Sequence, residues 1–93
     1  MLEVDIIKHS GKRPSEKYDR EKLKRSIIAA CLSSRTPEGL AEEIAENVCQ
    51  NVEQWLERRQ VVTSNDLRTV ATRSFQLRHP EAAYIYDHNR VII

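Results

Sequence analysis

The sequence has few residues of the kinds that build metal sites or disulfide frameworks. Among 93 residues there are two Cys, two Gly and three Pro, and aromatic residues make up 5%. Cys31 and Cys49 lack the CxxC spacing of a zinc site, so we expect both to be small buried apolar groups. His9, His79 and His88 share no metal-ligand spacing with them. We therefore assign no metal-ligand cluster.

The sequence also lacks a long apolar run. No stretch approaches the roughly 18 apolar residues of a membrane span, and residues 1–5 do not resemble a signal peptide. There is no internal repeat, low-complexity tract or flexible linker. We therefore expect a cytoplasmic protein without membrane contact, folded as a single domain over residues 1–93.

Charge is nearly balanced in total but unevenly distributed along the chain. The formal net charge is +1, yet residues 1–25 carry eight Lys and Arg against five Asp and Glu. Residues 36–57 carry six Glu and no Lys or Arg. A protein that binds polyanions over a wide surface is expected to be more basic. The pattern argues against DNA as a partner and leaves room for a small, local anion site.

Alternation and turn residues predict a small sheet. Residues 2–9 alternate with a period of two, which is typical of a strand with one face on a core. The segment SGKRP supplies turn chemistry, and residues 15–19 are expected to return as a second strand. Residues 60–64 are rich in β-branched side chains and too few for a helix, and they could add a third strand.

Four helices are expected, opening at Asp19, Pro37, Thr63 and Pro80. The first is expected to end near Leu32 and the second near Arg59. On the second helix, apolar residues recur every four positions and should face the core: Leu40, Ile44, Val48, Val52 and Leu56. Its carboxylates at 42, 43 and 46 are expected to be solvated. The fold class is α+β and mostly helical, a four-helix bundle capped at one end by a sheet of two to three strands.

Two of these helix starts carry residues suited to an anion. Lys22 lies in the first turn of its helix, where the dipole disfavours a cation, and a bound anion would reverse that penalty. At the third helix Ser64 offers a hydroxyl, and Arg68 lies one turn further along the same face. Solvated side chains and ordinary caps would give the same residues, so this pattern indicates an anion site without fixing it.

The hairpin adds further polar residues near these helix starts. Lys8 is on the same face as Ile6, which should face the core, and Glu16 and Asp19 follow on the return. A carboxylate here could accept a hydrogen bond from an exocyclic amine such as adenine N6, or pair with a neighbouring cation. No nucleophile, metal cluster or poised His accompanies the carboxylates, so we expect no enzyme activity.

Three segments together resemble the ATP-cone, a regulatory nucleotide-binding domain of many ribonucleotide reductases and of the reductase-operon repressor. They are IIKHSGKRPSEKYDREKLKRSI, VVTSNDL and AAYIY, within residues 4–86. The resemblance implies a four-helix bundle capped by a small sheet. It also implies ATP or dATP as ligand, commonly with Mg²⁺, and a nucleotide-dependent change in self-association or in docking to a larger regulated protein.

The same resemblance implies a set of nucleotide-binding residues: Ile6, Lys8, His9, Glu16, Asp19, Lys22, Ser64 and Arg68. Within this set, the two lysines and the histidine would lie by the phosphates, with Lys22 reaching phosphate or ribose. The two carboxylates would face the adenine. Ile6 would line the site with its backbone, and the two residues of the third helix would close it. Tyr86 stands where many members have Arg.

Two other functions stay open. A small DNA-binding regulator could read DNA through residues 63–78, which carry Arg68, Arg73 and Arg78. The balanced charge argues against this function, and the zinc module of the reductase-operon repressor is missing. A structural protein–protein module could instead use the basic hairpin to bind an acidic partner, and it would not respond to nucleotides.

Overall fold

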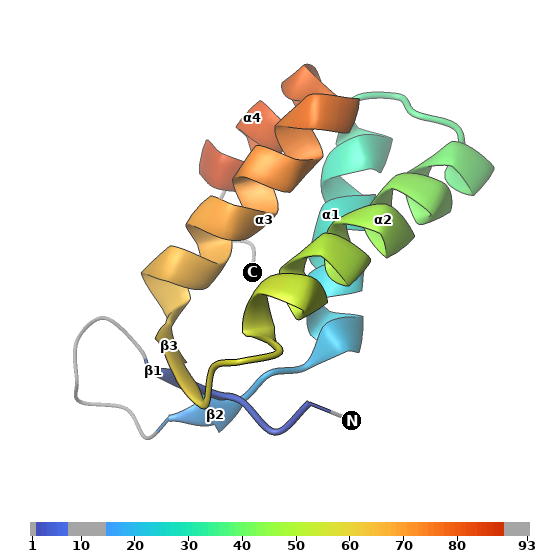
Figure 1. Ribbon diagram of the computed structural model, residues 1–93. Coiled ribbons are helices and arrows are strands. Elements are labelled where there is room, and N and C mark those ends of the chain that lie inside the picture. The colour runs from blue at the N-terminus through green and yellow to red at the C-terminus, as the bar shows by residue number, and fades with distance from the viewer. Residues whose placement is uncertain (1, 8–14, 89–93) are drawn as a thin grey trace.

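The computed structural model describes residues 2–7 and 15–88, as four helices and three short strands (Figure 1). In chain order they are β1 (Asp5–Ile7), β2 (Glu16–Lys17), α1 (Arg20–Ser33), α2 (Glu38–Leu56), β3 (Val61–Thr63), α3 (Ser64–Arg78) and α4 (Pro80–His88). This arrangement confirms the expected α+β class, with a helical bundle capped at one end by a sheet. Within the described ranges, no helix combines the length and apolarity that a membrane crossing requires.

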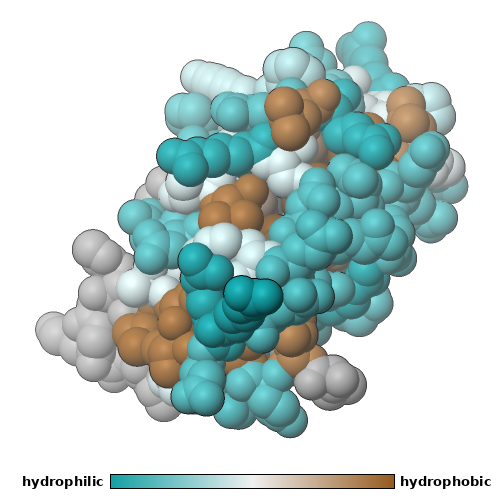
Figure 2. Space-filling model, viewed as in Figure 1, coloured by the Kyte–Doolittle hydropathy of each residue, from teal (hydrophilic) through white to brown (hydrophobic). Residues whose placement is uncertain are grey.

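The sheet has the strand order β2-β1-β3. β2 pairs with β1 antiparallel, with Ile6 opposite Glu16, and β3 pairs with β1 parallel, with Ile6 opposite Val62. The expected third strand is therefore confirmed. Val4 and Ile6 are 2% and 4% exposed, while Ile7 is 43% exposed, as alternation along a strand requires. Figure 2 shows apolar surface at the sheet end of one face.

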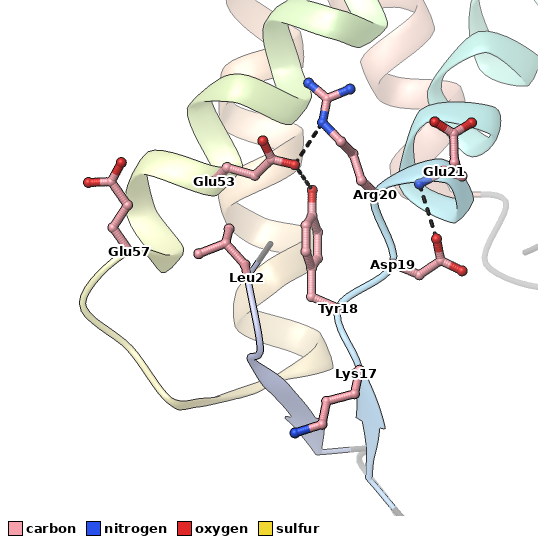
Figure 3. A pocket seen from close by; sticks show the side chains of 8 residues that line it. All are labelled: Leu2, Lys17, Tyr18, Asp19, Arg20, Glu21, Glu53 and Glu57. Carbon is pink, nitrogen blue, oxygen red and sulfur yellow. Dashed lines mark hydrogen bonds and ion pairs between the residues drawn. The ribbon is translucent and has the colours of Figure 1, made fainter.

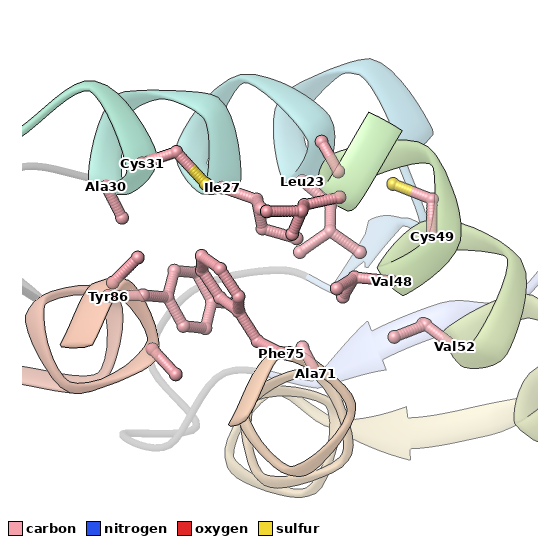
Figure 4. Close-up of a cluster of buried hydrophobic side chains, with 14 of the residues drawn as sticks. Leu23, Ile27, Ala30, Cys31, Val48, Cys49, Val52, Ala71, Phe75 and Tyr86 are labelled. Atoms are coloured by element: carbon pink, nitrogen blue, oxygen red, sulfur yellow. The ribbon is translucent and has the colours of Figure 1, made fainter. Parts of the chain in front are cut away.

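All four helices contribute to one core (Figure 4). Its labelled members are Leu23, Ile27, Ala30 and Cys31 from α1, Val48, Cys49 and Val52 from α2, Ala71 and Phe75 from α3, and Tyr86 from α4. The rings of Phe75 and Tyr86 lie 5.9 Å apart between centroids. Both cysteines are free and buried, as expected. Burial raises the pKa of each thiol to about 11, so both stay protonated at neutral pH.

The second helix differs from its prediction at both ends. Pro37 is the N-cap residue, and the helix ends at Leu56 instead of Arg59, because the chain must turn there to enter β3. Leu40 is 47% exposed, so its expected place in the core was wrong. The first turn of α2 lies at the end of the bundle (Figure 1), where neighbouring helices no longer cover that side.

The end of the bundle away from the sheet is closed by a polar link. Arg35 adopts a left-handed conformation with φ 61°, so the Thr36 N–H turns back to the Cys31 carbonyl at 3.0 Å and ends α1. The Thr36 hydroxyl then lies 2.8 Å from Nε2 of His79. His79 Nδ1 accepts from the Ala82 N–H at 3.4 Å, so Nε2 carries the proton and donates to Thr36.

Candidate functional site

The sheet brings the end of β1 alongside the start of α3. Ile7 pairs with Thr63, and Thr63 is the N-cap of α3, since its hydroxyl accepts from the Asp66 N–H at 3.0 Å. This confirms the expected cap and makes Ser64 the first residue of the helix. Lys8 and His9 follow β1 directly in the chain, but they lie outside the described residues. The strand therefore ends next to the unpaired backbone N–H groups of a helix N-terminus.

The start of α1 is capped by Asp19, as the sequence predicts. Asp19 Oδ1 accepts from the N–H groups of Glu21 and Lys22, at 3.1 and 3.3 Å. Glu21 adds a carboxylate in the first turn, where the positive end of the helix dipole favours it. Lys22 has the opposite sign in that same turn, so its ammonium needs an anionic partner to offset the dipole.

The structure supplies this partner from within the chain. Lys22 Nζ lies 3.2 Å from Glu16 Oε1, and the two side chains are 46% and 49% exposed. Because Glu16 is opposite Ile6 in the sheet, the structure brings Ile6, Glu16 and Lys22 together. The neighbouring Lys17 contacts Asp5 at 2.9 Å instead.

Arg68 is directed toward α4. Its Nη1 donates to the Tyr86 carbonyl at 3.3 Å, and its guanidinium carbon lies 5.2 Å from the centroid of the Tyr86 ring. Tyr86 itself is only 5% exposed, so it belongs to the core. No hydrogen bond or ion pair joins Arg68 to Glu16 or Lys22 in the part of the chain that the structure describes. Only Nη1 of Arg68 donates to Tyr86, and a guanidinium carries further N–H donors that could contact an anion.

Residues 4–88 match the family model of the ATP cone domain, which extends over nearly the whole chain. The chain belongs to the ATP-cone family. It is 34% identical over 83 residues to the transcriptional repressor NrdR of Thermosynechococcus vestitus, covering 88% of this chain and 48% of that protein. The chain thus spans about half the length of this relative. No solved structure matches the chain.

Membership of the ATP-cone family confirms the resemblance drawn from the three segments. It implies a regulatory role based on nucleotide binding. The expectation that DNA is not a partner is not supported, because the similar protein is named as a transcriptional repressor. Over residues 2–7 and 15–88, no three His, Cys, Asp or Glu side chains gather as a metal site.

A polar network beside the α1 start of this ATP-cone was missed in the sequence (Figure 3). Arg20 Nε donates to Glu53 Oε2 at 2.8 Å, and its two terminal nitrogens meet the carboxylate of Glu46, with Nη1 3.1 Å from Oε1. The Tyr18 hydroxyl donates to the same Glu53 oxygen at 2.9 Å. Glu46 is 41% exposed, as a solvated carboxylate should be, but its pairing with Arg20 was not expected. The available signal was the spacing of Glu46 and Glu53, two helical turns apart on one side of α2.

A cleft of about 950 Å³ lies beside this network, lined by Leu2, Lys17, Tyr18, Asp19, Arg20, Glu21, Glu53 and Glu57 (Figure 3). Its four carboxylates outnumber its two cations, and both cations already pair with carboxylates. Such a lining repels a triphosphate. Of the residues expected at the nucleotide, it contains Asp19 alone, so we do not assign the nucleotide to this cleft.

Proposed function

We propose that this ATP-cone binds ATP or dATP between the end of β1 and the starts of α1 and α3, as a single domain over residues 1–93. The observation that carries the proposal is the parallel pairing of Ile7 with Thr63. It supports a site in which the basic residues after β1 face the N-terminus of α3. Backbone N–H groups, the Ser64 hydroxyl and lysine ammonium groups together suit phosphate oxygens.

The phosphates would bind by an exchange of partners at Lys22. In the described structure its ammonium pairs with Glu16, and half-exposed pairs of this kind contribute only about 0–1 kcal/mol. A triphosphate carries several negative charges and would displace Glu16 from Lys22. Lys8 and His9 would add positive charge from the segment after β1, and a bound phosphate would favour the protonated imidazole.

The carboxylates would then recognise the base. Glu16 could accept a hydrogen bond from the adenine amino group. Asp19 uses Oδ1 for both capping bonds, which leaves Oδ2 to accept another donor. Ile6 would line the site through its backbone. Arg68 would close the site from α3 with guanidinium N–H groups other than the one that donates to Tyr86.

Mg²⁺ would be held chiefly by phosphate oxygens and water. This cation prefers oxygen ligands and keeps several waters when it is bound together with nucleotide phosphates. The described residues contain no three-carboxylate group that would hold it alone. The bound ion would screen the charge of the phosphates, and the chain's own residues would orient the triphosphate.

The regulatory output that we propose is a change in self-association or in docking to a larger protein. A role within a transcriptional repressor is a second candidate, favoured by the identity with NrdR. The test of this candidate is binding of this chain to duplex DNA, with an affinity that falls steeply as salt concentration rises.

The nucleotide site is tested by titration calorimetry with the double variant Lys8→Ala/Lys22→Ala. Each lost charge-assisted contact is expected to weaken binding by roughly 10–150-fold, which abolishes micromolar ATP binding while helical content is retained. Arg73→Ala/Arg78→Ala is the matched control, since it removes the same charge from exposed positions on α3. Unchanged heats in the double variant would refute this site.

Thermal shifts with ATP, dATP and ADP separate this function from a nucleotide-independent interaction module. A ligand that binds the folded domain raises its apparent melting temperature by mass action. A module that binds only proteins would melt at the same temperature with each nucleotide and without any.

A further inference from the structure

The first residue of α1 is attached to α2 by both its side chain and its backbone. The guanidinium of Arg20 bridges Glu46 and Glu53, which lie on α2 seven residues apart. The carbonyl of Arg20 lies 4.0 Å from Sγ of Cys49, a weak thiol contact to the same helix. Four contacts therefore join one residue to the longest helix of the bundle.

Tyr18 makes a second side-chain contact with α2. It belongs to the two-residue link between β2 and α1, and its hydroxyl meets the Glu53 oxygen that also accepts from Arg20. Burial and this hydrogen bond raise the pKa of Tyr18, so the phenol remains a donor at neutral pH. Glu53 thus holds both the link and the helix start, and its side chain is only 25% exposed.

We propose that Arg20, Glu53 and Tyr18 are positioning residues, which hold the first turn of α1 against α2 so that Asp19 and Lys22 face the nucleotide. This inference rests on the proposed function. The side chains of Tyr18 and Arg20 reach α2, where Glu53 accepts from both, and none of the three needs to touch the ligand. They act indirectly, by fixing the orientation of Asp19 and Lys22.

The first turn of a helix needs such support more than its middle does. Its N–H groups have no intrahelical acceptor, and here two of them depend on Asp19 Oδ1 alone. A rotation of this turn would move the Asp19 carboxylate and the Lys22 ammonium together. An error of about 1 Å in such groups is enough to lose much of a charge-assisted contact.

Simple electrostatics and positioning predict opposite results for Glu53→Gln. Removing a carboxylate near a phosphate site should strengthen ATP binding through lower repulsion. Loss of positioning should weaken it, by about three- to tenfold for one part-buried hydrogen-bonded group. Tyr18→Phe leaves the charge unchanged and retains the ring, so its expected three- to tenfold loss has no electrostatic explanation.

The experiment measures ATP affinity by calorimetry for wild type, Glu53→Gln and Tyr18→Phe, with two matched controls. Glu42→Gln removes an exposed carboxylate from the same helix without touching the network. Thr36→Val removes a part-buried hydrogen bond at the far end of the bundle, and so lowers stability without loosening α1. Both controls should bind ATP within about twofold of wild type.

A second measurement needs no nucleotide. Amide hydrogen exchange by NMR should quicken at Glu21 and Lys22 in Glu53→Gln and Tyr18→Phe, and stay unchanged at Asp66 in the first turn of α3. Wild-type or tighter ATP binding in both variants would overturn the proposal, as would unchanged exchange. If wild type bound no ATP, the proposed function would fail, and the exchange data would still decide whether the network orders the α1 start.

Discussion

The two helix starts that flank the central strand are held in different ways. The start of α3 follows β3 without a gap, and its place is set by backbone pairing with β1 and by the Thr63 cap. The start of α1 follows β2 after two residues. A backbone hydrogen bond from Tyr18 to Val4 holds this link, and the helix start itself is held mainly by side-chain contacts with α2. A start fixed by main-chain register tolerates most substitutions, whereas one fixed by charged side chains responds to single substitutions, salt and pH.

This difference suggests that the two helix starts have different roles in nucleotide binding by the ATP-cone. The α3 start would offer fixed N–H groups to the phosphates. The α1 start would carry the groups that change partner, with Lys22 moving from Glu16 to the ligand. Because α2 holds the α1 start through Arg20 and Glu53, a movement of the α1 start on nucleotide binding would be passed to α2 through the same contacts.

The largest expected effect is a loss of folding stability that affects the starts of α1 and α3 equally. Phe75 is fully buried and packs on Tyr86, so Phe75→Ala should lower the free energy of unfolding by about 3–5 kcal/mol. Urea denaturation measures it. Amide exchange should quicken at Lys22 and Asp66 alike, since the whole core opens. Phe75→Met is the control, because its longer apolar side chain leaves a smaller cavity than alanine and should therefore cost less. A loss confined to one helix start would contradict the idea of a common core.

The next largest effect tests whether the starts of α1 and α3 are stabilised independently. Arg20→Ala should cost about 1–3 kcal/mol, because charge-assisted hydrogen bonds are lost from a side chain that is 32% exposed. Thr63→Ala should cost about 1 kcal/mol, the usual value of an N-cap. If the anchors are independent, the double variant loses the sum of both within about 0.5 kcal/mol. A coupling energy above about 1 kcal/mol in this cycle would show that both starts belong to one network.

The features that the sequence predicts correctly are local. The caps at Asp19 and Thr63 are visible because a capping side chain and its N–H partners lie within three residues. The third strand is recognisable from its β-branched residues. Arg20 could not be paired from the sequence, since its acceptors lie 26 and 33 residues away and α2 alone offers five carboxylates. The direction of Arg68 depends in the same way on how α4 packs against α3.

The smallest expected effect concerns pH. The hydrogen bonds from Arg20, helped by its charge, hold the pKa of Glu46 below the ordinary value of 4.5. A carboxylate with a lowered pKa in the folded state contributes stability that is complete above pH 4.5 and is lost as pH falls through the folded value. The difference in unfolding free energy between wild type and Glu46→Gln should therefore be constant near neutral pH and shrink on acidification. Urea denaturation from pH 7 to pH 3 measures it, with Glu42→Gln as the control that leaves the network intact. A difference that stayed constant down to pH 3 would mean that Arg20 does not lower the pKa of Glu46 in the folded domain.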